Sequence, residues 1–115
     1  MIIRGGINIF PAEVENAYQE NDNIAESCLV GYPDPELGER SCLCVVLEPG
    51  HDPSAHELRS FAKGKVEKCK IPDVVLKMDA LPKLDNGKID KKTLRSQVPI
   101  LLEQPLANRA RKGWK

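Results

Sequence analysis

The sequence predicts a small α+β domain, in which an open sheet of about three strands plus an N-terminal hairpin is packed by about three helices. Apolar residues repeat at helical spacing in some segments, whereas in others they alternate or run together as in strands. Clusters of Gly, Pro, Asn and Asp separate these segments and predict the turns. At 115 residues the chain is long enough for one domain with a single modest core.

The first half of the chain predicts a hairpin, a helix and two strands. MIIRGGINIF forms the hairpin, because Gly5 and Gly6 tolerate the positive φ angles of a tight turn. Pro11 suits the first turn of the helix that follows. We expect IAESCLVGY and RSCLCVVLEPG to be the strands, joined by the turn-rich loop PDPELGE. The Val-Val-Leu run of the second strand indicates burial on both of its faces.

The second half predicts a helix, a strand and a final helix. The first of these helices should occupy about residues 54 to 68 and begin with a capping box of Ser54 and Glu57. The segment VVLKM is the expected strand. Asp90 then caps the helix KKTLRSQV, which Pro99 should end because proline lacks a backbone N–H and clashes with the preceding turn.

Composition narrows the function classes. The 17 basic and 17 acidic residues balance, so no global charge draws the chain to nucleic acid or to an anionic membrane. No apolar run approaches the ~20 residues that span a bilayer, and the N-terminus lacks the features of a signal peptide. We therefore expect a cytoplasmic protein, with one domain at 1–98 and a loosely ordered tail at 99–115.

The four cysteines, Cys28, Cys42, Cys44 and Cys69, are expected to be reduced thiols. Cys42 and Cys44 are two residues apart on a predicted strand, so both side chains should point to the same face. We interpret them as small buried hydrophobic residues. Since a zinc site more often shows C-x-x-C pairs, no metal site is expected.

The stretch LPKLDNGKID, at 81–90, raises the question of whether Lys88 has a catalytic role. By spacing alone, Lys88 after the Asn86-Gly87 turn is a solvated charge, because "GK" here lacks the earlier glycine and the following Ser or Thr of a phosphate-binding loop. No Cys–His, Ser–His or paired-carboxylate arrangement indicates an independent active site. The residues by themselves thus predict an α+β domain and leave its function open.

Four motifs taken together resemble a known family. In chain order they are IIRGGINIFPAEVE, VGYPDPELGE, CKIP and LPKLDNGKIDKKTLR. They are similar to the C-terminal domain of adenylate-forming enzymes, which include acyl- and aryl-CoA synthetases, luciferases and the adenylation domains of nonribosomal peptide synthesis. The likeness covers about residues 1–98, which is nearly all of the chain outside the tail.

The resemblance implies a reaction in two halves. A carboxylate attacks the α-phosphate of ATP to give an acyl-adenylate and pyrophosphate, and a thiol of coenzyme A or of a carrier protein's phosphopantetheine arm then displaces AMP. A large N-terminal adenylation domain, which is not in this chain, would bind the carboxylic acid, ATP and Mg²⁺. The C-terminal domain would swing between two orientations, one for each half-reaction, and alone it should catalyse nothing.

The resemblance also implies roles for individual residues. Lys88 would be the catalytic lysine of adenylate formation, where a fixed cation stabilises charge that builds around phosphorus. Gly5 and Gly6 would leave room for the pantetheine arm to pass close to the backbone. Lys70 would meet a phosphate of coenzyme A, and Leu37 is a candidate contact for pantetheine.

The family pattern has departures and structural positions as well. Many relatives carry an aromatic residue just before the lysine of CKIP, but Cys69 stands there, which disfavours stacking of a nucleotide base. We interpret Glu13 and Glu15 as structural residues that pair with nearby backbone or with Arg4. The family's hinge residue and the Gly-Arg before it would precede the segment that opens this chain.

Our preferred interpretation is the C-terminal domain of an acyl-CoA synthetase, using ATP, Mg²⁺ and coenzyme A in fatty acid metabolism. One alternative is an aryl-acid or amino-acid adenylating domain that loads a carrier protein, and another is a non-catalytic interaction domain with the same fold. A third class is a metal or nucleic-acid module. It would use the cysteines or the basic tail residues Arg109, Arg111, Lys112 and Lys115 with Trp114.

Overall fold

The computed structural model describes residues 1–102 and the backbone of residues 109–111. Its elements are β1 (Ile2–Arg4), β2 (Ile7–Ile9), α1 (Pro11–Tyr18), β3 (Ile24–Asp34), β4 (Gly38–Leu47), α2 (Ala55–Phe61), the 3₁₀ helix η1 (Lys68–Lys70), β5 (Val74–Lys77), α3 (Lys91–Leu101) and β6 (Arg109–Arg111). The predicted α+β class is confirmed. The sheet has six strands, and the strand that was not expected, β6, lies in the segment predicted to be a tail.

The sheet is built around β4. Along the path β2-β1-β4-β5-β6 the strands are neighbours, and β3 pairs with β4 off this path. The β3–β4 pairing is antiparallel and extends from Ile24 opposite Leu47 to Asp34 opposite Gly38. Because β3 occupies one edge of β4 over this length, β1 and β5 share the other edge. There β1 meets Gly38 antiparallel, and β5 runs parallel to β4 from Cys42.

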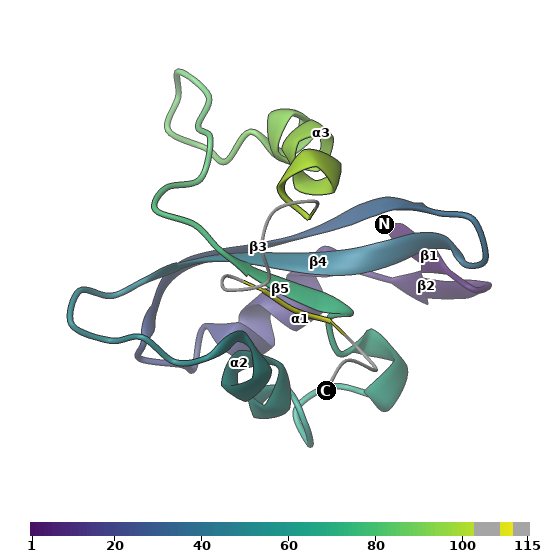
Figure 1. Ribbon diagram of the computed structural model, residues 1–115, viewed down its shortest axis with the longest axis horizontal. Coiled ribbons are helices and arrows are strands. Elements are labelled where there is room, and N and C mark those ends of the chain that lie inside the picture. The colour runs from purple at the N-terminus through teal and green to yellow at the C-terminus, as the bar shows by residue number, and fades with distance from the viewer. Residues whose placement is uncertain (103–108, 112–115) are drawn as a thin grey trace.

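Helices cover both faces of the sheet, with α1 and α2 on one face and α3 on the other (Figure 1). Val45 packs in the core between the sheet and α1 and α2, and Leu47 lies against that core. Val46 lies against the core beneath α3. The prediction that the Val-Val-Leu run is buried on both faces is therefore confirmed.

The two helices on the first face begin where the sequence predicts. Pro11 is the first residue of α1, and the hydroxyl of Tyr18 at its end donates to the carbonyl of Leu58 in α2 at 2.7 Å. Ser54 caps α2, since its hydroxyl accepts a hydrogen bond from the N–H of Glu57 at 3.0 Å. The predicted extension of this helix to about residue 68 is wrong. It ends at Phe61, and the left-handed φ of Gly64, +82°, turns the chain away.

Helix α3 is longer than the sequence predicts. Asp90 caps it as expected, accepting the N–H of Thr93 at 3.1 Å, but Pro99 lies inside the helix rather than at its end. Proline removes only one helical hydrogen bond there, and Leu102 beyond it is buried against the sheet, which compensates for that loss. Most of the predicted tail, residues 103–108 and 112–115, lies outside the described residues.

Candidate functional site

The loop that carries Lys88 is a compact hairpin between β5 and α3. Lys83 and Ile89 form an isolated antiparallel bridge, and the N–H of Leu84 donates to the carbonyl of Lys88 at 2.7 Å. At the turn, the N–H of Lys88 donates to Asn86 Oδ1 at 3.0 Å, and Gly87 has a φ of +86° that favours glycine. Short-range bonds thus fix the backbone of Lys88.

The side chain of Lys88 is exposed. No hydrogen bond or ion pair holds its ammonium group within the described part of the chain. The base of the loop is anchored instead, because Leu81 is buried and Lys83 forms an ion pair with Glu26 of β3. Hydrogen bonds from the N–H and hydroxyl of Thr93 lower the pKa of Asp90, where the loop meets α3. The anchored loop thus presents the ammonium group of Lys88 without a partner among the described residues.

The structure brings Gly5, Gly6 and Leu37 together where the β1–β2 and β3–β4 hairpins turn. The N–H of Gly5 donates to the carbonyl of Leu37 at 2.9 Å. A Cβ on Gly5 would lie 3.2 Å from Leu37 Cδ2, whereas a Cβ on Gly6 would have nothing within 4 Å. Both glycines have positive φ angles, +57° and +86°. A side chain at Gly5 would therefore press against Leu37, whereas Gly6 borders open space.

Lys70 lies at the end of η1 and is already paired. Its Nζ is 3.0 Å from Glu13 Oε2 and 3.5 Å from Glu67 Oε1. Donation to Glu13 is the main reason that the pKa of Lys70 is raised. Any phosphate at Lys70 must compete with these carboxylates.

The structural roles predicted for the two glutamates are correct in part. Glu15 accepts the N–H of Leu29 at 2.8 Å, which is the backbone pairing that we expected. Glu13 pairs with Lys70, whereas Arg4 is bound to Asp73. Both glutamates therefore have structural partners, but among the described residues neither pairs with Arg4.

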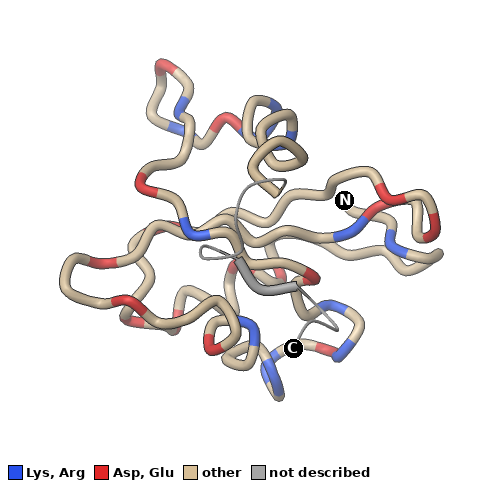
Figure 2. The backbone as a smooth tube through the Cα atoms, in the orientation of Figure 1, with Lys and Arg blue, Asp and Glu red and all other residues tan. Residues whose placement is uncertain are grey.

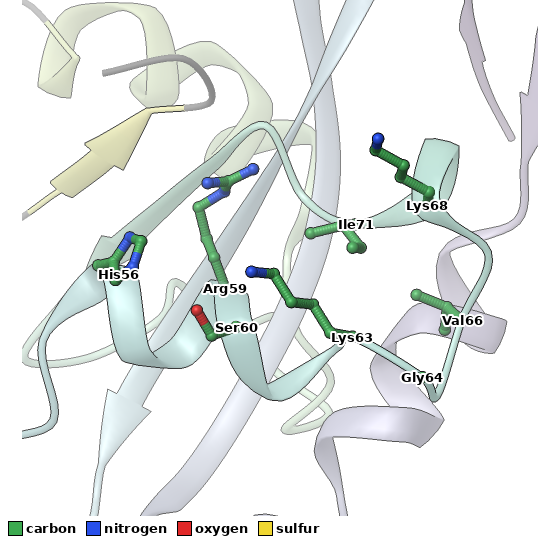
Figure 3. A pocket seen from close by; sticks show the side chains of 8 residues that line it. All are labelled: His56, Arg59, Ser60, Lys63, Gly64, Val66, Lys68 and Ile71. Atoms are coloured by element: carbon green, nitrogen blue, oxygen red, sulfur yellow. The ribbon is translucent and has the colours of Figure 1, made fainter. Parts of the chain in front are cut away.

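A basic groove that the sequence analysis missed lies between α2 and η1 (Figure 3). Its volume is about 360 Å³, and it is lined by His56, Arg59, Ser60, Lys63, Gly64, Val66, Lys68 and Ile71. The side chain of His56 is exposed. The groove was missed because residues 54–68 were assigned to one helix. The early end of α2 places Lys63 and Lys68 on the same groove, and the density of lysines in this segment was the available signal.

The predicted site residues thus fall into three places, which are the Lys88 loop, the two hairpin turns and Lys70 at η1. The Lys88 loop projects beside α3 at one side of the domain, whereas the turns of the two hairpins lie at the far end of the sheet (Figure 1). Figure 2 shows basic residues on the Lys88 loop and again around α2 and η1. Lys70 belongs to the second basic region, next to the groove.

Three of the four cysteines, Cys28, Cys42 and Cys44, are buried thiols. Cys42 Sγ and Cys44 Sγ are 3.9 Å apart, and both lie with Cys28 in the core beneath α3, as predicted. Burial is the main reason that the pKa of Cys28 is raised to about 12. In residues 1–102 and 109–111, no group of three or more His, Cys, Asp or Glu side chains could hold a metal ion.

Two further observations concern membranes and nucleic acid. No helix among the described residues is both long and apolar enough to cross a bilayer. The side chains of the basic tail that could contact nucleic acid lie outside the described residues.

Comparison with known proteins decides the family. Residues 13–88 match the family described as the AMP-binding enzyme C-terminal domain. The chain belongs to this family. The mitochondrial medium-chain acyl-CoA ligase of Mus musculus is 40% identical to this C-terminal domain over 98 residues, which are 85% of this chain and 16% of that protein.

Solved structures agree with this assignment. The fatty acyl CoA synthetase of Mycobacterium tuberculosis is 32% identical, with a TM-score of 0.79, over 84% of this chain and 19% of that one. The acyl-CoA synthetase of Brucella canis is 30% identical, with a TM-score of 0.80, over 90% of this chain and 19% of that one. The chain therefore spans less than a fifth of the length of these relatives, and Lys88 is the last residue of the family match.

Proposed function

We propose that this domain serves an ATP-dependent, AMP-forming ligase that joins a carboxylic acid to coenzyme A, and that Lys88 acts in the first half-reaction. One observation carries the proposal. Lys88, at the end of the family match, is exposed on an anchored loop and has no side-chain partner among the described residues. Its ammonium is therefore available to ATP and an acid bound by a second domain.

The chemistry of this step favours a lysine. A carboxylate oxygen bonds to the α-phosphorus of ATP, and the bond from that phosphorus to the bridging oxygen breaks to release pyrophosphate. Two anions must approach each other, and charge builds on the oxygens around phosphorus. The compact ammonium of Lys88 would stabilise this charge, and losing such a contact in other enzymes costs about 10²–10³ in rate.

The second half-reaction would use the hairpin turns. The thiol sulfur of coenzyme A bonds to the acyl carbon, the bond to the AMP oxygen breaks, and the thiol proton passes to solvent. Because a Cβ on Gly6 would meet nothing within 4 Å, the pantetheine arm can pass close to the backbone there. Leu37, which receives the hydrogen bond from Gly5, offers an apolar contact beside this path.

The basic groove fits the other end of coenzyme A. Arg59, Lys63 and Lys68 surround it, while Val66 and Ile71 contribute apolar surface, which suits a phosphorylated nucleoside. We place the phosphates in this groove, with Lys70 contributing charge nearby, since Glu13 already occupies its ammonium. The groove favours free coenzyme A as the acceptor, because a carrier-protein arm lacks the adenosine 3′-phosphate.

The separation of the Lys88 loop from the hairpin turns supports movement of the domain. The domain measures 37 × 32 × 28 Å, and the loop at 81–90 and the hairpin turns lie on different sides of it (Figure 1). A single orientation against a fixed acyl group could not present both. We therefore propose that the domain alternates between two orientations, one for each half-reaction.

The cellular location is a separate proposal. The cysteines of this chain are free thiols, which is compatible with the reducing cytoplasm that we expected. The mitochondrial location of the Mus musculus relative belongs to that protein.

The test is made on the full-length protein. ATP–pyrophosphate exchange is measured with a panel of carboxylic acids, beginning with medium-chain fatty acids because the Mus musculus relative is a medium-chain acyl-CoA ligase. An active acid is then offered with coenzyme A or with a phosphopantetheinylated carrier protein. We expect AMP and a CoA thioester. A folded protein that exchanges with no acid would instead be an interaction domain, and product on the carrier protein alone would overturn the choice of coenzyme A.

A further inference from the structure

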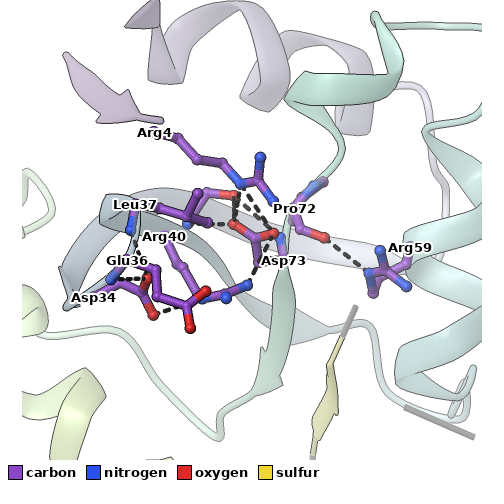
Figure 4. A network of polar contacts seen from close by, with 9 residues as sticks. Arg4, Asp34, Glu36, Leu37, Arg40, Arg59, Pro72 and Asp73 are labelled. Atoms are coloured by element: carbon purple, nitrogen blue, oxygen red, sulfur yellow. Dashed lines mark hydrogen bonds and ion pairs between the residues drawn. The ribbon is translucent and has the colours of Figure 1, made fainter. Parts of the chain in front are cut away.

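Asp73 is a fully buried carboxylate at the shared edge of β4, between the ends of β1 and β5 (Figure 4). Arg4 Nε lies 2.9 Å and 3.1 Å from its two oxygens. The N–H of Ser41 donates to the same carboxylate at 3.0 Å, and the N–H of Asp73 donates to Ser41 Oγ at 3.1 Å. Asp73 therefore hydrogen-bonds to β4 at Ser41, between the position that pairs with β1 and those that pair with β5.

The network extends from Asp73 to the turn that touches Gly5. Arg40 Nη1 lies 3.9 Å from Asp73 Oδ1, and Arg40 Nε donates to Asp34 Oδ1 at 2.7 Å. The other oxygen of Asp34 accepts the N–H of Leu37 at 2.8 Å. Hydrogen bonding to Arg40 holds the pKa of Asp34 below its usual value. Since Leu37 in turn binds Gly5, the network reaches Gly5 from both sides.

The same segment also reaches the basic groove. Pro72 precedes Asp73, and its carbonyl accepts a hydrogen bond from Arg59 Nε at 2.8 Å. Arg59 lines the groove. Lys70, three residues before Asp73, ends η1. One short stretch of chain therefore links the groove, Lys70 and the network that holds the glycine turn.

The free-energy cost of burying Asp73 indicates that the network fixes geometry rather than adds stability. Burying a carboxylate costs several kcal/mol, and apolar side chains of similar volume often stabilise a fold as well or better. Asp73 and Asp34 are balanced by Arg4 and Arg40, so the cluster is neutral. The hydrogen bonds from Arg4 to Asp73 and from Arg40 to Asp34 are also directional. None of these four side chains forms a hydrogen bond or ion pair with residues 81–90 in the described part of the chain. Among the described residues, the network therefore connects the hairpin end and, through Pro72, the basic groove, and it does not reach the Lys88 loop.

We infer that Asp73 is a positioning residue, which through Arg4 holds the Gly5–Gly6 turn at a fixed distance from the basic groove. Coenzyme A bound by its phosphates in the groove then delivers its arm to that turn. This inference rests on the proposed function. It assigns the network to thioester formation and leaves adenylate formation independent of it.

The test uses Arg4→Gln in the full-length protein. Rotation of the turn by a fraction of an ångström misplaces the thiol path, so thioester formation from supplied acyl-adenylate should fall by about tenfold to a hundredfold. ATP–pyrophosphate exchange should stay near the wild-type rate. Arg4→Lys should recover part of the loss, because it restores the charge but not the forked geometry.

Controls separate this role from simple stabilisation. Asp34→Asn weakens the outer part of the network, and we expect a smaller but equally selective loss if Arg4→Gln folds poorly. Lys77→Met removes an unrelated ion pair, in which the Lys77 side chain is 18% exposed, close to the 15% of Arg4, and lies 3.0 Å from the exposed Asp52. It should leave both half-reactions unchanged. Melting temperatures are measured for every variant.

Two failures are distinguishable. If wild-type protein supports neither half-reaction, the proposed function is wrong. If wild-type protein is active but Arg4→Gln and Asp34→Asn lower both half-reactions equally, Asp73 has only a structural role and the inference is overturned.

Discussion

The Lys88 loop and the hairpin end of the domain are built in opposite ways. The turn that carries Lys88 is held by short-range backbone bonds and leaves the Lys88 side chain exposed. The hairpin end is held by Arg4, Asp34, Arg40 and Asp73, which come from segments far apart in the chain. A point charge acts through distance alone and needs only a local support. A path for a flexible arm needs several backbones in register, which requires long-range contacts.

Replacing Lys88 by Ala should give the largest effect and tests the independence of the two ends. Adenylate formation in the full-length protein should fall by about a hundredfold or more, because the attacking and leaving oxygens lose their nearby cation. Thioester formation from supplied acyl-adenylate should be unchanged. Lys92→Ala, at a second exposed lysine close by in α3, is the matched control and should be active. Equal loss in both half-reactions would contradict the separate roles of the Lys88 loop and the hairpin end.

Gly6→Leu should give the opposite pattern. Nothing lies within 4 Å of a Cβ at Gly6, yet its φ of +86° strains any side chain. Gly50, with a φ of +84° and equally open surroundings, offers a matched control with the same backbone strain. Gly6→Leu should lower thioester formation by about tenfold to a hundredfold by obstructing the arm, and Gly50→Leu should not. Similar rates for both variants would remove Gly6 from the site.

The same contrast explains what the sequence could predict. Lys88 lies in a short motif whose turn, cap and charge are contiguous, so its place followed from local patterns and from the family resemblance. Ser54, Pro11 and the buried strand β4 were predictable for the same reason.

Long-range contacts could not be predicted in this way. Arg4 was one of two partners considered for Glu13 and Glu15, the other being nearby backbone, but Arg4 binds Asp73, 69 residues away. The basic groove depends on the end of α2 at Phe61 and on the turn that follows, where Gly64 has a left-handed φ. Pro99 was expected to end α3, but the burial of Leu102 outweighs that local preference. In each case tertiary packing or a single backbone angle prevails over the local pattern.

Modification of Cys69 tests the placement of coenzyme A in the groove and should have a moderate effect on its binding. Cys69 is half-buried between Lys68 and Lys70, whereas Cys28, Cys42 and Cys44 are fully buried. A maleimide should therefore label Cys69 first, as mass spectrometry of peptides would show. The adduct should raise the KM for coenzyme A by about threefold to tenfold, equivalent to roughly 1 kcal/mol of binding free energy. Cys69→Ser protein should be insensitive to the reagent, and an adduct that slows adenylate formation instead would contradict the placement.

Acidification should give the smallest effect and compares the supports of the two ends directly. Hydrogen bonds lower the pKa of Asp90, below the Lys88 loop, and of Asp34, beside Leu37. A carboxylate whose folded pKa lies below its ordinary value stabilises the fold above that ordinary value, 3.8. This stability is lost as the pH falls through the folded pKa.

We therefore expect the free energy of unfolding, measured by urea denaturation, to decline as the pH is lowered below about 4. Asp90→Asn and Asp34→Asn should each make that decline shallower. Hydrogen exchange should separate the two ends when alanine replaces each aspartate, since Asp90→Ala removes the acceptor of the Thr93 N–H and Asp34→Ala removes that of the Leu37 N–H. If either substitution released both amides together, the two ends would be coupled, and the independence that the two half-reactions require would be lost.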